Sequence, residues 1–145
     1  DINKGYESSY ARFWERAYII YNNKLYFSAS DGIHGEELFF LDFNIQEVKM
    51  IADINKGALG SYPYLSRFFD EKIYFTAQDE IHGIEFRVIE QDQIKTLQEI
   101  YPGPSSSYPS DIVILNETIL IFAQDENYNQ KIWKIDTVLN SLDVK

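Results

Sequence analysis

The sequence predicts an all-β fold made of three tandem repeats, each with about four short antiparallel strands. Two observations carry this prediction: a short motif recurs along the chain, and apolar residues alternate with the two-residue period of strands instead of the helical period. The repeats cover residues 1–52, 53–98 and 99–145, and the length of 145 residues is typical of a single domain.

Three matching segments define the repeats. The motif Asp-Ile-Asn-Lys-Gly at residues 1–5 recurs at 53–57 and, more loosely, at 99–103. A Ser-Tyr pair follows each copy, at 9–10, 61–62 and 107–108. The segment Lys-Leu-Tyr-Phe-Ser-Ala-Ser-Asp at 24–31 has counterparts at 72–79 and 118–125. Their aromatic residues are expected in the core or between repeats; they are Tyr26, Phe27, Tyr74, Phe75 and Phe122.

Within the second repeat the alternation predicts strands near residues 64–70, 72–78, 84–89 and 94–100, separated by polar turns. The fourth strand is expected to run across each repeat boundary, at 48–54 and 94–100. The chain starts with an orphan Asp-Ile pair and no methionine, so we expect either a closed ring or a segment cut from a longer array. Apolar and polar residues alternate poorly at 8–17 and 137–142, so a helix is a possible alternative there.

Two all-β architectures fit this pattern. Four antiparallel strands per repeat are typical of a propeller blade, although a lobe of a β-trefoil has the same number. Closed propellers usually have four to eight blades, so three repeats fall short of that range and favour the trefoil, which three lobes complete. Both alternatives stay open on the repeat count.

Composition excludes several classes of function. The chain has 13 basic and 23 acidic residues and a net charge of −10, which repels phosphate and argues against nucleic-acid binding. It has no cysteine, so disulfides, thiol catalysis and thiolate zinc sites are excluded. No apolar run approaches the roughly 18 residues of a membrane span.

The segment at residues 24–39, Lys-Leu-Tyr-Phe-Ser-Ala-Ser-Asp-Gly-Ile-His-Gly-Glu-Glu-Leu-Phe, resembles the bacterial tandem repeat named for its Glu-Leu-Trp…Asp-Gly-Thr motif. The Asp-Gly-Thr turn is missing in all three copies, and Lys131-Ile132-Trp133 stands where the third Glu-Leu-Trp would be. The resemblance implies propeller-like blades, and it shifts the prediction toward them; the trefoil stays open as the alternative from the number of repeats. It also implies a secreted or cell-surface location within a large exported protein, and it supplies no catalytic residues.

The recurring aspartates Asp31, Asp79 and Asp125 each follow a strand and begin a polar connection. Asp31 and Asp79, with neighbouring glutamates, offer oxygen ligands for a calcium site. A structural turn is the favoured interpretation, because an aspartate at the start of a turn accepts backbone N–H groups and no calcium-loop spacing is present. We therefore expect no metal and no cofactor. The repeated His34 and His82, each followed by a glycine that permits a positive φ, are interpreted as turn or packing residues.

The first repeat has a four-residue insertion that the other two lack, near Phe13-Trp14-Glu15-Arg16. Around it, aromatic side chains and positive charges occur together in an otherwise acidic chain. Such residues dominate protein interfaces and also stack on sugars, so a partner-binding surface is predicted at Tyr10, Arg12, Phe13, Trp14 and Arg16. The alternative is a longer hairpin in which Trp14 folds back onto its own repeat.

No nucleophile elbow, phosphate loop, dinucleotide fingerprint or metalloprotease motif is present. The sequence therefore predicts a non-catalytic structural or interaction module of a larger protein, not an enzyme. Its partner would be a protein, a glycan or neighbouring domains of the same polypeptide. The alternative is a carbohydrate-active or other hydrolytic domain that uses surface carboxylates.

Overall fold

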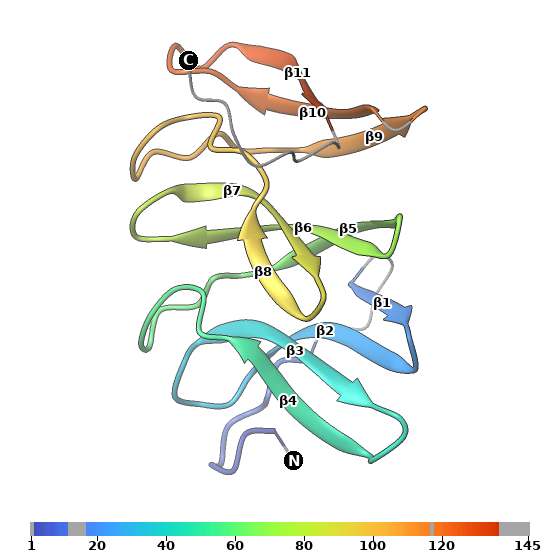
Figure 1. Ribbon diagram of the computed structural model, residues 1–145. Coiled ribbons are helices and arrows are strands. Elements are labelled where there is room, and N and C mark those ends of the chain that lie inside the picture. Colours follow the sequence, from blue (N-terminus) through green and yellow to red (C-terminus); the bar gives the residue numbers. More distant parts are fainter. Residues whose placement is uncertain (1, 12–16, 117, 137–145) are drawn as a thin grey trace.

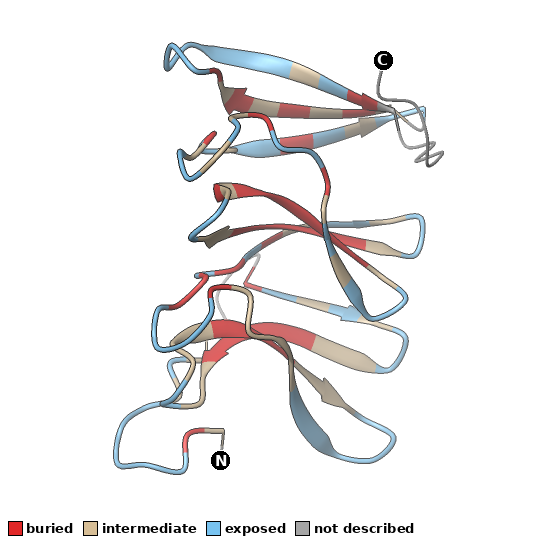
Figure 2. Ribbon diagram, turned by 60° about the vertical axis from the view of Figure 1, so that its left-hand side comes forward, coloured by how far each residue is buried: buried red, intermediate tan, exposed pale blue. Residues whose placement is uncertain are grey.

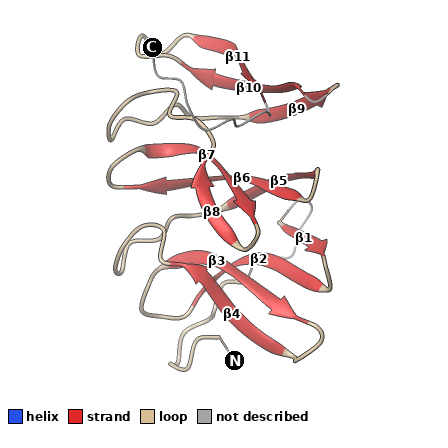
Figure 3. Ribbon diagram, in the orientation of Figure 1, coloured by secondary structure: helices blue, strands red, loops and turns tan. Residues whose placement is uncertain are grey.

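The computed structural model describes residues 2–11, 17–116 and 118–136, and every regular element in these ranges is a β-strand (Figure 3). The strands form three antiparallel sheets in chain order, which confirms the predicted all-β class. The first sheet contains β1 (Tyr18–Tyr21), β2 (Lys24–Ser30), β3 (Glu36–Asp42) and β4 (Glu47–Ala52). The second contains β5 (Tyr64–Phe69), β6 (Lys72–Asp79), β7 (Gly83–Glu90) and β8 (Gln93–Thr96). The third contains β9 (Asp111–Leu115), β10 (Thr118–Gln124) and β11 (Gln130–Asp136).

The three sheets lie one above another, with the first at the bottom of Figure 1 and the third at the top. Strands of the same rank face each other across the sheets: β1 contacts β5, β5 contacts β9, and β4 contacts β8. Each repeat is therefore one up-and-down sheet, and each sheet uses its neighbour to bury an apolar face.

Tight turns fix the register within each sheet. Two-residue turns join β1 to β2 at Asn22-Asn23, β5 to β6 at Asp70-Glu71 and β7 to β8 at Gln91-Asp92. All six turn residues have positive φ, between 48° and 60°. This is the backbone of a type I′ turn, whose twist matches that of the flanking strands.

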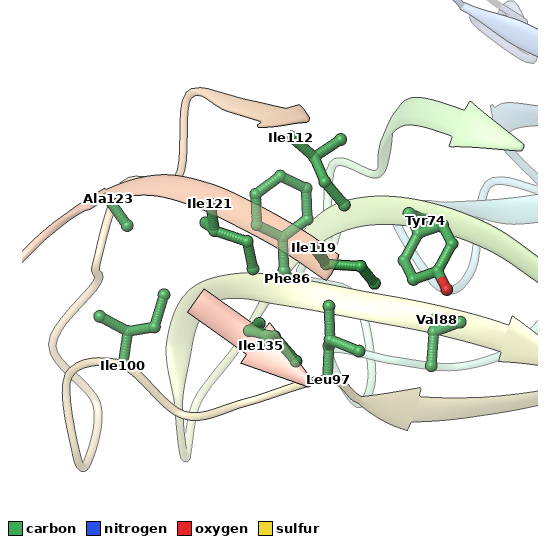
Figure 4. Packing of buried hydrophobic residues seen from close by; sticks show 10 residues of the cluster. All are labelled: Tyr74, Phe86, Val88, Leu97, Ile100, Ile112, Ile119, Ile121, Ala123 and Ile135. Atoms are coloured by element: carbon green, nitrogen blue, oxygen red, sulfur yellow. The ribbon is translucent and has the colours of Figure 1, made fainter. Parts of the chain in front are cut away.

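The core consists of apolar layers between and beside the sheets, as the buried stretches in Figure 2 show. One layer joins the second and third sheets, and Figure 4 shows its residues, including Phe86, Ile121 and Ile135. Another joins the first and second sheets around Leu38 and Phe75. The aromatic prediction holds for Tyr26, Phe27, Tyr74 and Phe75, which are all buried.

Two details of the sequence prediction are wrong. Phe122 is half-buried and lies outside the core clusters. The fourth strands end at Ala52 and Thr96 and do not run across the repeat boundaries. After Ala52, the backbone N–H groups of Ile54 and Asn55 donate to the buried Glu37. No helix forms in the described part of 8–17; residues 12–16 and 137–142 lie outside the described residues.

Candidate functional site

The recurring aspartates organise the turns that follow their strands. Oδ1 of Asp31 accepts the backbone N–H groups of Ile33 and His34 at 2.8 and 2.9 Å, and Oδ2 lies 2.7 Å from Nδ1 of His34. Oδ1 of Asp79 accepts the corresponding groups of Ile81 and His82 at 2.8 and 2.7 Å. The predicted turn role of both aspartates is confirmed by these hydrogen bonds.

Asp79 and Asp125 also each form an ion pair with a basic side chain. Asp79 bonds Arg87, whose side chain is buried, and Asp125 bonds Lys131. Burial opposes ionisation of Asp79, but the hydrogen bonds from His82 and Arg87 outweigh it and lower its pKa to about 2. The Lys131 ammonium and two backbone N–H groups lower the pKa of Asp125 to about 2. Within the described ranges no three histidine or acidic side chains are grouped as a metal ion would require.

The junctions between repeats centre on two glutamates that sequence reasoning missed, Glu37 and Glu85. Both side chains are 0% exposed. Glu37 accepts four hydrogen bonds from the loop that follows the first sheet, at 2.6–3.3 Å: the backbone N–H groups of Ile54, Asn55 and Ser61, and the Ser61 hydroxyl. Burial raises the pKa of Glu37, and these hydrogen bonds oppose the shift.

Glu85 makes the second junction in the same way. Its carboxylate accepts the Ser107 hydroxyl at 2.7 Å and the Tyr101 backbone N–H at 3.4 Å. We call residues 53–63 and 99–109 the connecting loops, since each one bonds to the glutamate of the preceding repeat. The sequence contained a signal for this contact, because Glu recurs two residues after the His-Gly glycine and Ser recurs before each tyrosine.

The glycines of the two His-Gly pairs allow the connecting loops to approach. Gly35 and Gly83 have φ of +70° and +62°, as predicted for these positions. A Cβ on Gly35 would lie 2.4 Å from the backbone nitrogen of Gly60, and one on Gly83 would lie 2.7 Å from the carbonyl oxygen of Ser105. These glycines are therefore required by the next loop as well as by their own turn.

The tyrosine of each Ser-Tyr pair is exposed and has an unusual backbone. Tyr10, Tyr62 and Tyr108 are 60%, 56% and 54% exposed, with φ of 48°, 49° and 45°. The preceding serine carbonyl accepts a backbone N–H from the strand in all three repeats, at 2.7–2.9 Å, so the three positions are equivalent. We call these three residues the tyrosine row. A bulky residue in the left-handed region is rare, and here one occurs at the same position of all three repeats.

Of the predicted partner-binding residues, the structure places Tyr10 in the tyrosine row. Arg12, Phe13, Trp14 and Arg16 lie outside the described residues. The repeat of Tyr10 at Tyr62 and Tyr108 extends the candidate surface beyond the first repeat, along the stack of sheets.

A pocket of about 390 Å³ lies between the turns of the first and second sheets. At its edge Asp92 accepts a hydrogen bond from Lys24 at 2.8 Å, and the Tyr26 hydroxyl lies 3.4 Å from the same carboxylate. Burial and the Asp92 charge raise the pKa of Tyr26 to about 12. Glu90 is held by Lys95 and Lys72, which lower its pKa.

Acid catalysis of glycoside cleavage needs a carboxyl group of raised pKa facing the pocket. The two glutamates whose pKa burial raises, Glu37 and Glu85, are instead enclosed in the junctions and occupied by loop donors. Four carboxylates line the pocket, and two of them, Asp92 and Glu90, are paired closely with lysines. This arrangement is suited to joining two sheets.

A comparison of the chain with protein-family models, curated proteins and solved structures finds no match. The described residues contain no helix that is long and apolar enough to cross a membrane.

Proposed function

We propose that this chain is a non-catalytic interaction module of a larger exported bacterial protein, and that its stacked sheets are propeller-like blades. Two observations support the blade architecture: each repeat is an up-and-down sheet, and strands of equal rank face each other between sheets. The resemblance of residues 24–39 to the Glu-Leu-Trp…Asp-Gly-Thr repeats supports the bacterial and exported setting.

The tyrosine row is the observation that carries the binding proposal. A left-handed backbone at a non-glycine residue costs about 1 kcal/mol or more, and such strain collects at functional sites. Burial does not offset this strain, since the side chains of Tyr10, Tyr62 and Tyr108 are each more than half exposed. Three costly and exposed aromatic side chains at equivalent positions are best explained by a partner that contacts them.

The spacing and charge of this surface favour an extended, uncharged polysaccharide. Stacked sheets lie about 10 Å apart, so the tyrosine row offers rings at regular intervals to a polymer of repeating units. Aromatic rings bury the apolar faces of sugars, and the hydroxyl group of tyrosine can bond to them. The net charge of −10 disfavours anionic polymers.

Retention of the chain in gels that contain cellulose, chitin or xylan tests this proposal. We expect retention by at least one of these polymers and a loss of about tenfold or more in affinity for the Tyr10→Ala, Tyr62→Ala, Tyr108→Ala triple variant. Tyr128→Ala is the matched control, because Tyr128 is 71% exposed, also has positive φ and lies outside the tyrosine row. Equal retention of the triple variant would reject the tyrosine row as the binding surface. Retention by none of the polymers would reject the glycan and favour a protein partner.

A further inference from the structure

The contact between consecutive repeats is built twice in this chain, from the same three parts. The first part is a Gly-Xaa-Glu segment at the start of the third strand, at Gly35 to Glu37 and at Gly83 to Glu85. The second is a connecting loop whose donors bind that glutamate. The third is a pair of apolar sheet faces that pack together.

At the outer end of the first repeat, the loop part is present without a glutamate. Residues 2–11 repeat two hydrogen bonds of the connecting loop 53–63, one within the loop and one to the second strand of its sheet. Nδ2 of Asn3 donates to the Ser8 carbonyl at 3.5 Å, as Nδ2 of Asn55 donates to the Gly60 carbonyl at 3.1 Å. The Ser9 carbonyl accepts the Ser30 N–H at 2.7 Å, as that of Ser61 accepts the Gln78 N–H at 2.9 Å.

The donors of this first loop are the counterparts of those that bind Glu37. They are the backbone N–H groups of Ile2, Asn3 and Ser9, and the Ser9 hydroxyl. Among the described residues none of these four groups has a hydrogen-bond partner. Ser61 and Ser107 are 1% and 0% exposed beneath their glutamates, whereas Ser9 is half-buried. The first loop thus presents the same set of donors that binds a carboxylate at the first junction, without an acceptor among the described residues.

The apolar part is present at the same end. Leu25, Phe27 and Leu41 lie on the face of the first sheet that points away from the second. Their strand partners on that face are Ile20, Tyr18 and Val48, which are 61%, 44% and 42% exposed. The corresponding face of the second sheet, with Ile73, Phe75 and Ile89, packs against the first sheet. The outer face of the first sheet is thus the same kind of apolar face that packs between repeats, and Tyr18, Ile20 and Val48 on its strands β1 and β4 are exposed.

The opposite end of the chain is different. In the third repeat Asn129 stands at the position of Gly35, and Lys131 at that of Glu37. A Cβ at the glycine position collides with the backbone of an incoming loop at both observed junctions. Lys131 would bring a cation to four hydrogen-bond donors, and it is already bonded to Asp125. Ile132 is 61% exposed, whereas its counterparts Leu38 and Phe86 are 0% exposed.

We propose that the outer end of the first repeat is a docking site for a further four-stranded repeat that carries Gly-Xaa-Glu at the start of its third strand. The incoming glutamate accepts the Ile2, Asn3 and Ser9 donors, and its sheet covers the Tyr18, Ile20 and Val48 edges. The third repeat of this chain cannot occupy the site, because it has Asn129 and Lys131 at the two positions that the junction requires. Two copies of the chain therefore do not join head to tail.

A mixture of the unchanged chain with a variant whose third repeat carries the Gly-Xaa-Glu segment tests this proposal. We call the variant Ser9→Ala, Asn129→Gly, Lys131→Glu the donor chain, because it gains the Gly-Xaa-Glu segment. It also loses the Ser9 hydroxyl, which would donate a hydrogen bond to an incoming glutamate. The unchanged chain, whose first loop would bind the new glutamate, is the acceptor chain. Sedimentation velocity of the unchanged chain alone is expected to give a monomer. Its mixture with the donor chain is expected to give a 1:1 dimer at concentrations where the donor chain alone, which lacks the Ser9 hydroxyl, associates more weakly.

The matched control is Ser9→Ala, Asn129→Gly, Lys131→Gln, which removes the cation but supplies no carboxylate. It is expected to bind the unchanged chain at least tenfold more weakly than the donor does. Circular dichroism verifies that both variants fold; if the new carboxylate beside Asp125 prevents folding, Asp125→Asn is added to both. A mixture that stays monomeric, or a control that associates as tightly as the donor, would overturn the proposal.

Discussion

Glu37 and Ser61 meet across the boundary between the first and second repeats, where the serine hydroxyl donates to the carboxylate at 2.6 Å. Ser107 donates to Glu85 at 2.7 Å across the next boundary. Both carboxylates are fully buried, and a buried carboxylate is tolerated only when its oxygens are occupied by donors. The connecting loop supplies those donors, so the loop and the glutamate stabilise each other.

Glu37→Ala is expected to lower the free energy of unfolding by about 4 kcal/mol, because it leaves several buried donors without an acceptor. Glu37→Gln keeps one acceptor oxygen and is expected to cost about half as much. Denaturation by urea measures both. Glu47→Ala is the control, since the Glu47 carboxylate is 57% exposed, and its effect should stay within about 0.5 kcal/mol. A Glu37→Ala variant as stable as this control would show that the junction is not held by the carboxylate.

Gly35→Ala is expected to destabilise the protein by about 3 kcal/mol, because the new Cβ meets the backbone of the connecting loop in addition to straining its own φ. Gly57→Ala separates the two effects. Gly57 has φ of +91°, but a Cβ added there would meet nothing within 4 Å, so only backbone strain of about 1 kcal/mol applies. Thermal or urea unfolding compares the two variants. Equal losses would mean that the loop moves aside without cost.

The repeats, the strand period and the turn aspartates could be predicted from the sequence because each depends on neighbours close in the chain. Asp31 and His34, for example, are three residues apart, and their contact needs no residue from another part of the chain. The roles of Glu37 and Ser61 could not be predicted with the same ease, since they are 24 residues apart and each looks like an ordinary surface residue by type. The exposure of Tyr10 and its counterparts likewise depends on how the strands begin, which alternation does not determine.

The end of the fourth strand also depends on a contact that is distant in the sequence. Residues 48–54 alternate as a strand does, and alternation alone extends β4 through Ile54. The structure ends β4 at Ala52 because the N–H groups of Ile54 and Asn55 turn toward Glu37. A long-range acceptor thus overrides the local pattern at the repeat boundary.

Stability is expected to fall in acid through Asp79. The folded-state pKa of Asp79 is about 2, below its ordinary value of 3.8, so its ionised form stabilises the fold above about pH 4. This contribution, about 2 kcal/mol, is lost as the pH falls from about 4 through about 2. Asp79→Asn should therefore be clearly less stable than the unchanged chain at pH 7, and the difference should shrink by about 2 kcal/mol toward pH 2.

Urea unfolding at several pH values measures this difference. Asp70→Asn serves as the control, because the Asp70 carboxylate is 68% exposed and its contact with Lys72 is long, at 3.8 Å. Its effect should be small at every pH. A difference between the unchanged chain and Asp79→Asn that does not vary with pH would show that Asp79 acts through packing and not through its charge.

Tyr62→Gly tests whether the tyrosine row is kept for binding or for stability. Glycine adopts the φ of 49° at this position without strain, which returns about 1 kcal/mol, while its greater freedom in the unfolded chain costs about 0.5–1 kcal/mol. The net change in the free energy of unfolding should therefore lie within about 0.5 kcal/mol of zero. Polysaccharide retention, in contrast, should fall.

Tyr64→Gly is the matched control for this change. Tyr64 is 47% exposed, close to the 56% of Tyr62, but it lies in β5 and does not have a positive φ. Glycine in a strand has no strain to relieve, so this variant should lose about 1 kcal/mol. If Tyr62→Gly costs as much as Tyr64→Gly, the Tyr62 ring stabilises the fold from the surface. The strained backbone would then be explained by packing, and the main argument for a binding surface along the tyrosine row would be lost.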